Sequence, residues 1–425
     1  MPVPHGNSFF SHCRAAFAII AIASMACAQA EAPAVATIGT PAKPFRAPFV
    51  PDADEEVLQE VPAAADPSVK AIRSLRAQLD AQPANLEVAN ELAKAYIDFG
   101  RQLGDAHYVG YAEAVIAPWL ARMAPPVTTL VVYATILQYR HRFAQAREQL
   151  TKALKLDSRN AQAWLTLATL EMVQGDYTAA ARDCGQVASY SGPIVGIACS
   201  ANLRSYLGQA RQSVAVLTAI GMRSRGLPAP YAAWIEGLLA ESEERLGDWP
   251  QVEAHYRKAL SYAPNDNFLL VALADFLLDR GRPSEVLTLL ERNAQSDTAF
   301  LRLVLAQAAL KSPALPRYVW VMSARFAALS QRGDDLFGRE QVRFALHAQH
   351  DPQTALDLAE QNWKVQRAPW DVRVFLEAAL AANQPKAALP VLEFLDRTKL
   401  EDPIIKPLAG ELRGRIAKQA ARDAR

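Results

Sequence analysis

A spacing of 33 to 34 residues between short polar turns is the sequence feature that most constrains how this chain folds. Residues 160–193 serve as the reference stretch, because two helix-length apolar patterns flank a tight turn at Gly175-Asp176. The successive turn gaps are 34, 33, 39, 34, 69 and 33 residues. The gap of 69 therefore contains two units, with a turn missing near Lys311-Ser312-Pro313. A period of this length predicts stacked helical hairpins rather than one ordinary core. The candidate turn residues are His141, Gly175, Gly208, Gly247, Gly281, His350 and Asn383.

Large and small side chains recur in the same phase as these turns. In the reference unit an early aromatic residue precedes a Leu-Ala pair, and another Ala follows in the second helix. The second unit after it repeats this pattern. Alanine at a helix crossing lets two backbones approach closely, while large residues fill the grooves between neighbouring units. The residues that carry the pattern are Trp164, Leu167, Ala168, Tyr177 and Ala180, and then Leu239, Ala240, Trp249, Tyr256 and Ala259.

This pattern resembles the tetratricopeptide repeat family, and the resemblance covers about residues 84–403. The family resemblance implies an all-α fold, a right-handed superhelical solenoid of about nine antiparallel helix pairs. No unit of such an array buries its apolar face alone, so both ends need caps. Residues 67–83 are expected to form an N-terminal capping helix, and residues 404–425 a C-terminal capping helix with a basic tail.

The N-terminus reads as a secretory signal peptide over residues 1–30. Arg14 precedes an apolar run that ends at Ala26, and cleavage is expected after Ala30, behind a small-x-small site. The run is shorter than the ~20 residues that span a bilayer, so an uncleaved anchor is the weaker alternative. A lipoprotein at Cys27 is disfavoured because no Leu stands three places before it. With no Asn-x-Ser/Thr sequon after residue 30, we expect an exported, periplasmic bacterial protein.

Residues 31–66 are rich in proline and alanine and show no sustained helical period. Proline removes backbone donors and fixes the chain, so this segment is expected to be an extended leader. Val57, Leu58 and Val61 are apolar residues through which the leader could dock on the folded body.

Composition limits the classes of function. The chain has 425 residues and a net charge of +1, with 51% hydrophobic and 21% charged residues, values typical of a folded protein. Nucleic acid is disfavoured as a partner because duplex-binding proteins show a basic excess. No phosphate-binding loop, nucleophile elbow or zinc-protease helix is present, so we expect no enzyme activity and no cofactor.

Cys184 and Cys199 are the only cysteines beyond the signal peptide. They stand equally far from the turn at 191–192, which places them at equal height on adjacent antiparallel helices. Such positions can be bridged by a disulfide, and an oxidising compartment would favour it. Two buried free thiols are the alternative, since cysteine often serves as a small core residue.

Other polar clusters favour ordinary structural readings. His347 and His350 are three residues apart, but no third ligand stands at metal-site spacing, so no metal site is expected. His141 is read as a solvated turn residue. Glu243-Glu244 and Asp334-Asp335 are read as solvated helix faces rather than as general acid/base pairs.

Binding is the favoured activity. The family resemblance implies that the first helix of each unit lines a concave groove. Its exposed polar positions would begin rich in amides and tyrosine and become acidic toward the middle of the array. These candidate binding residues are Asn90, Lys94, Gln138, Tyr139, Asn202, Tyr206, Glu241, Arg245, Asp275 and Asp279.

The sequence thus predicts a non-catalytic protein-protein interaction scaffold of the bacterial cell envelope that holds a protein segment in its groove. One alternative is an accessory subunit of an export or outer-membrane assembly complex that uses its convex face or its leader. A repeat-based carbohydrate-binding protein or enzyme is a further alternative.

Overall fold

The computed structural model describes residues 66–223, 226–331 and 338–423, and every regular element in these ranges is helical. The expected signal peptide, Cys27 and the leader up to residue 65 lie outside the described residues, as does Asp334-Asp335. None of the helices in the described ranges is both long and apolar enough to cross a membrane.

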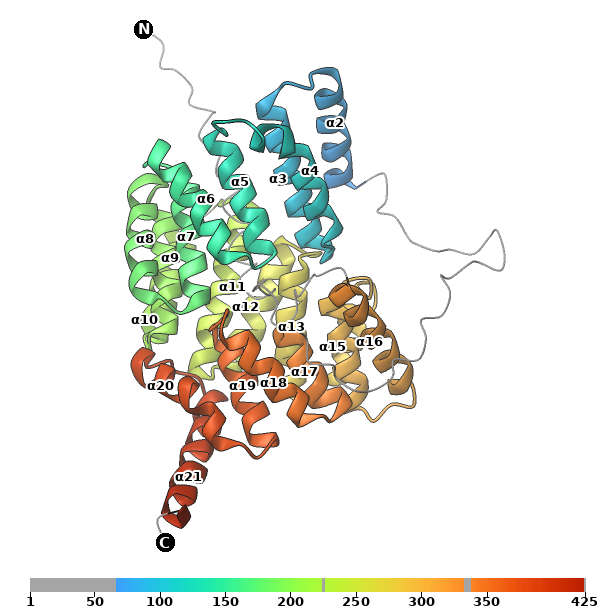
Figure 1. Ribbon diagram of the computed structural model, residues 1–425, viewed down its shortest axis with the longest axis vertical. Coiled ribbons are helices and arrows are strands. Elements are labelled where there is room, and N and C mark those ends of the chain that lie inside the picture. Colours follow the sequence, from blue (N-terminus) through green and yellow to red (C-terminus); the bar gives the residue numbers. More distant parts are fainter. Residues whose placement is uncertain (1–65, 224–225, 332–337, 424–425) are drawn as a thin grey trace, which may run out of the picture.

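Helices alternate with short turns along the chain (Figure 1). The first half contains α2 (Pro67–Ala81), α3 (Leu86–Leu103), α4 (His107–Leu120), α5 (Val127–Tyr139), α6 (Phe143–Leu156), α7 (Ala161–Gln174), α8 (Tyr177–Tyr190), α9 (Pro193–Tyr206), α10 (Ala210–Arg223), α11 (Ala229–Leu246) and α12 (Trp249–Tyr262). The second half contains α13 (Asn267–Asp279), α14 (Pro283–Leu290), α15 (Asp297–Ala309), α16 (Leu315–Gln331), α17 (Gly338–Phe344), η3 (Ala345–Gln349), α18 (Pro352–Trp363), α19 (Pro369–Ala381), η4 (Pro385–Ala388), α20 (Leu389–Thr398) and α21 (Ile405–Asp423).

Consecutive helices pack as pairs, from α3 with α4 to α19 with α20. The turn inside each of these pairs contains a residue with left-handed backbone, which ends a helix and lets the chain reverse. All seven predicted turn residues adopt this conformation, with φ between 51° and 76°. The turn missing from the sequence pattern is at Lys311, whose φ is 49°. The predicted repeat phase is therefore confirmed.

Small residues occupy the helix crossings, as the pattern predicted. Ala168, Ala180, Ala240 and Ala259 are fully buried. Gly196 replaces alanine at the α8–α9 crossing, where a Cβ atom would lie 2.2 Å from the Cα atom of Ala188. This close approach positions the neighbouring cysteines. Cys184 on α8 and Cys199 on α9 form a disulfide, with their Cα atoms 5.6 Å apart and both side chains fully buried.

The array coils so tightly that distant hairpins touch. Arg101 at the end of α3 forms an ion pair with Asp266, the N-cap residue of α13. On the opposite side, the turns of early hairpins meet the C-terminal segment: the Arg367 N–H donates to the Val173 carbonyl over 2.8 Å, and Gly208 lies against the Lys399 carbonyl. Figure 1 shows α18 to α20 beside the ends of the green and yellow helices.

Both ends of the array carry an additional helix. The Asp66 side chain caps α2, accepting from the Ser68 N–H over 2.7 Å, and α2 packs on α3. At the other end, α21 packs on α19 but buries only Ile405, Ala409 and Leu412. Most of α21 is therefore exposed to solvent.

Candidate functional site

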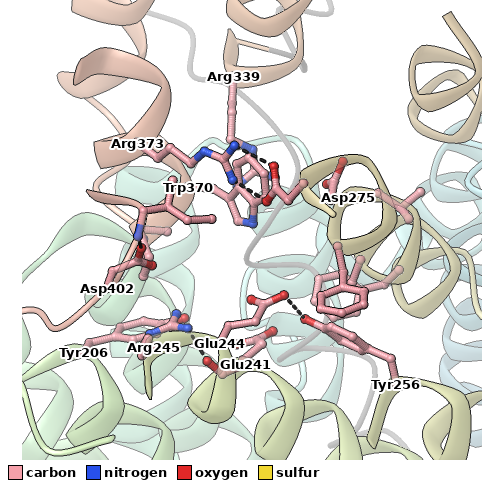
Figure 2. A pocket seen from close by; sticks show the side chains of 18 of the residues that line it. Tyr206, Glu241, Glu244, Arg245, Tyr256, Asp275, Arg339, Trp370, Arg373 and Asp402 are labelled. Atoms are coloured by element: carbon pink, nitrogen blue, oxygen red, sulfur yellow. Dashed lines mark hydrogen bonds and ion pairs between the residues drawn. The ribbon is translucent and has the colours of Figure 1, made fainter. Parts of the chain in front are cut away.

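The first helices of six consecutive pairs converge on a central cavity of about 100 Å³. Residues from α9, α11, α13, α15, α17 and α19 line it, together with Trp249 and Tyr256 of α12 and with Asp402 and Ile404 from the loop before α21. Figure 2 shows the labelled side chains pointing toward one another from these elements. Because the superhelix coils back on itself, the C-terminal pairs narrow its concave side at this level to a partly open cavity, whose lining includes apolar side chains beside the charged ones.

One wall of the central cavity is a buried ion network. Arg302 on α15 donates two hydrogen bonds to Asp275 on α13, over 2.9 and 2.7 Å, and its Nη1 lies 3.5 Å from Glu340 on α17. Arg343 approaches Asp275 from α17 over 2.8 Å. Burial favours the neutral acid, but Arg302 and Arg343 outweigh it and lower the pKa of Asp275 to about 2. The network therefore ties three neighbouring first helices together.

A second ion pair joins helices far apart in the sequence. Arg373 on α19 donates to both oxygens of Asp279 on α13, over 2.6 and 2.7 Å. The Trp370 ring lies between two guanidinium groups, with Arg343 at 4.6 Å and Arg373 at 4.4 Å from its centroid. Such contacts are stabilised by the negative face of the indole ring. The pair thus closes the C-terminal wall of the cavity.

The floor of the cavity has charges that the described residues leave unpaired. The Arg245 guanidinium is 7% exposed, donates to the Glu241 backbone carbonyl and lies 5.0 Å from the Tyr206 ring centroid. The carboxylates of Glu241, Asp402 and Glu244 lie near enough to interact with its charge, but within the described residues none is at ion-pair distance and its Nε has no acceptor. The Glu241 carboxylate likewise accepts no hydrogen bond there. Arg245 can donate a hydrogen bond to a bound molecule, and Glu241 can accept one from it.

Glu244 on α11 accepts a hydrogen bond from the Tyr256 hydroxyl over 3.2 Å. Burial raises the pKa of Glu244 to about 8, with Glu241 and Asp402 adding to the shift and Arg245 opposing it. Glu244 is therefore largely protonated at neutral pH. Its reading as part of a solvated helix face was wrong, because the C-terminal hairpins cover this part of α11.

Replacing Glu244 with Gln is expected to remove a pH-dependent loss of stability. A carboxyl group whose folded-state pKa is raised from about 4.5 to about 8 contributes stability below pH 4.5, and this is lost as the pH rises to 8. Glu244→Gln keeps an acceptor for Tyr256 and should stabilise the protein by roughly 2 kcal/mol or more at pH 8.5, with little effect at pH 5. Urea unfolding at both pH values measures the difference. An equal effect at pH 5 and 8.5 would contradict it.

The structure brings six of the ten predicted groove residues together in the central cavity: Asn202, Tyr206, Glu241, Arg245, Asp275 and Asp279. The other four lie near the N-terminal pairs. Asn90 and Thr128 share a hydrogen bond of 3.0 Å, and Lys94 pairs with Glu91 over 3.0 Å. Gln138 and Tyr139 lie at the end of α5.

The predicted exposure of these positions was wrong for six residues. Each of the six is less than 9% exposed: Asn90, Gln138, Asn202, Tyr206, Arg245 and Asp275. The last four line the cavity that the C-terminal pairs cover, whereas Asn90 bonds to Thr128 of the adjacent helix α5. The sequence also missed the residues that complete the cavity from the C-terminal pairs. Glu340, Trp370 and Arg373 lie 65 residues or more beyond Asp275, and no local pattern marks them.

A second, larger space opens beside the central cavity. This side cleft, of about 490 Å³, lies between the start of α2, the end of α3, α11 and the turn before α13. Trp234, Leu238, Phe268 and Leu269 form its apolar part, and the Arg101–Asp266 ion pair lies at its edge. Glu241 and Phe268 line both spaces, so the side cleft and the central cavity adjoin.

Within residues 66–223, 226–331 and 338–423, no group of three or more His, Cys, Asp or Glu residues is placed to hold a metal ion. His347 lies 3.5 Å from a Glu377 oxygen, and His350 occupies a left-handed turn. His141 is not solvated as expected: it is 2% exposed, stacked on Phe143 and 3.1 Å from Gln366 of the loop before α19.

Helix pairs at the predicted period, left-handed turns in phase and small residues at the crossings make this chain a superhelical solenoid of the tetratricopeptide type. Among solved structures, the chain is similar to yeast Tom70, with 17% identity and a TM-score of 0.37, over 78% of this chain and 62% of that one. It is also similar to the P58(IPK) TPR domain (12% identity, TM-score 0.20, 84% of this chain and 95% of that one). A third likeness is to the APC/C hetero-tetramer Cut9–Hcn1 (14%, 0.28, 77% and 83%). No family model and no curated protein matches the sequence.

Proposed function

We propose that this protein is a non-catalytic interaction scaffold that takes a segment of a partner protein in the side cleft. The observation that carries the proposal is the cleft itself, which offers about 490 Å³ beside apolar side chains on the concave side of a repeat array. Concave spaces of this size, with a few polar groups at one edge, are typical of binding sites. Glu241, which lines the cleft where it adjoins the central cavity, supplies an acceptor for the segment's donors.

The chemistry of the central cavity supports binding rather than catalysis. Its most buried charged residues are engaged in the ion pairs of Arg302 and Arg373, which fix helices in place. The protonated Glu244 hydrogen-bonds to Tyr256. Such groups hold the walls of the cavity in one arrangement. We further propose that the protein acts in the bacterial periplasm, as its N-terminal sequence suggests.

Site-specific crosslinking tests the proposal. A photoreactive phenylalanine analogue at Tyr262, which lines the side cleft and is 41% exposed, should capture one defined partner segment in cells. The same analogue at Trp320 on α16 is the matched control, because this side chain is 66% exposed and lies outside the cleft.

Affinity for the captured segment should then depend on the cleft aromatic residue. Trp234→Ala is expected to weaken binding about tenfold or more, since buried aromatic residues dominate such interfaces. Trp320→Ala should leave the affinity unchanged. Calorimetric titration gives both values, and equal affinities for the two variants would place the binding site elsewhere.

A further inference from the structure

The described chain begins inside the side cleft. Asp66, Pro67 and Ser68 all line it, and the Asp66 cap fixes the direction in which α2 starts. Residue 65 is therefore attached at the cleft, and 35 residues separate the expected cleavage site from Asp66.

The sequence next to this attachment point matches the chemistry of the cleft. Val57, Leu58 and Val61 stand at positions i, i+1 and i+4, which share one face of a helical turn. The residues between and around them are acidic or amide residues that fall on the opposite face: Glu55, Glu56, Gln59 and Glu60. An apolar face of this width fits a cleft built from Trp234, Leu238, Phe268 and Leu269.

The covalent link at Asp66 keeps this apolar segment close to the cleft. Val61 is five residues before Asp66, so it can reach up to about 17 Å from the attachment point. A segment held by so short a linker has an effective concentration on the order of millimolar at the cleft. The acidic face need not enter the cleft, because Arg101 at its edge is already neutralised by Asp266.

We infer that residues 55–61 of the protein's own leader occupy the side cleft in the free protein. This inference rests on the proposed function, since it assigns the same cleft an occupant in cis that a partner must displace. The partner segment must then carry the same pattern, three apolar residues at i, i+1 and i+4 with acidic residues on the other face. The tethered leader segment competes with the partner for the cleft at millimolar effective concentration. The apparent affinity of the partner is therefore reduced in proportion to the fraction of molecules whose cleft is free.

A synthetic peptide of residues 51–66, labelled with fluorescein, tests the inference by anisotropy. The protein is the mature chain, residues 31–425, as wild type or as Leu58→Asp/Val61→Asp. The labelled peptide is expected to bind the double variant at least about tenfold more tightly than the wild type. Val35→Asp/Ile38→Asp, which changes apolar residues farther from Asp66, is the matched control and should behave as wild type.

Two further measurements locate the contact. Trp234→Ala in the Leu58→Asp/Val61→Asp background should abolish peptide binding, and α11 should exchange amide hydrogens faster in the double variant than in the wild type. Failure of the peptide to bind the double variant, or equal binding to wild type and double variant, overturns the inference. If the Tyr262 crosslink to a partner persists in that case, the scaffold proposal stands without the leader contact. If the peptide behaves as expected but no partner is captured, the scaffold proposal is the one that fails.

Discussion

Gly208→Ala is expected to destabilise the protein by about 3 kcal/mol, whereas Gly281→Ala should cost only about 1 kcal/mol. Both glycines end a first helix with nearly the same left-handed backbone, φ 69° and 68°. They differ in their surroundings. A Cβ atom at Gly208 would lie 2.3 Å from the Lys399 carbonyl oxygen, while one at Gly281 would meet nothing within 4 Å. The difference between the two variants therefore isolates the contact that closes the superhelix.

Urea unfolding measures the cost of each variant, and hydrogen exchange shows which part of the array is affected. In Gly208→Ala the amides around Lys399 should exchange faster, and urea unfolding should begin at lower denaturant concentration. Gly281→Ala should leave exchange at Lys399 unchanged. If both variants cost the same, the turn of the fourth pair does not touch the C-terminal segment in solution and the array is open.

The repeat was predictable because its signals are local. A left-handed turn, an alanine at a crossing and the spacing between them lie within one 34-residue unit, so the sequence shows them directly. The Cys184–Cys199 bridge was predictable for the same reason, since both residues flank one turn. Seven turn residues and this disulfide could thus be placed without a structure.

Closure of the superhelix was not predictable in this way. It depends on the small rotation between successive pairs, which accumulates over many units and is set by side-chain packing at every interface. His141 illustrates the consequence: its turn conformation follows from the repeat, but its burial depends on Gln366, 225 residues later. The candidate site likewise depends on contacts between residues far apart in the sequence. The repeat pattern assigned acidic and aromatic residues of α9, α11 and α13 to the concave face. It did not predict that Trp370 and Arg373 of α19 would line the same cavity.

Because the ion network around Arg302 is buried, losing this arginine is expected to cost more stability than losing an arginine that pairs near the surface. Arg302 is almost fully buried, with side-chain exposure of 2%, and its acidic partners Asp275 and Glu340 are also buried, at 7% and 2%. Removing one member of a buried ion pair leaves an uncompensated charge, which commonly costs about 3–5 kcal/mol. Arg343 remains beside Asp275 when Arg302 is lost, so the cost of Arg302→Leu should lie near the lower end, about 3 kcal/mol.

Arg282→Leu is the matched control for Arg302→Leu. Arg282 also pairs with two carboxylates, Glu253 over 2.6 Å and Glu285 over 2.5 Å, but its side chain is 33% exposed. Water solvates those carboxylates when the guanidinium is removed, so the change should cost no more than about 1 kcal/mol. Urea unfolding of both variants measures the difference in stability. Arg302→Leu should also weaken binding in the side cleft, because α13, α15 and α17 lose the ion network that connects them. Equal costs for the two variants would mean that water reaches the central cavity and screens its ion pairs.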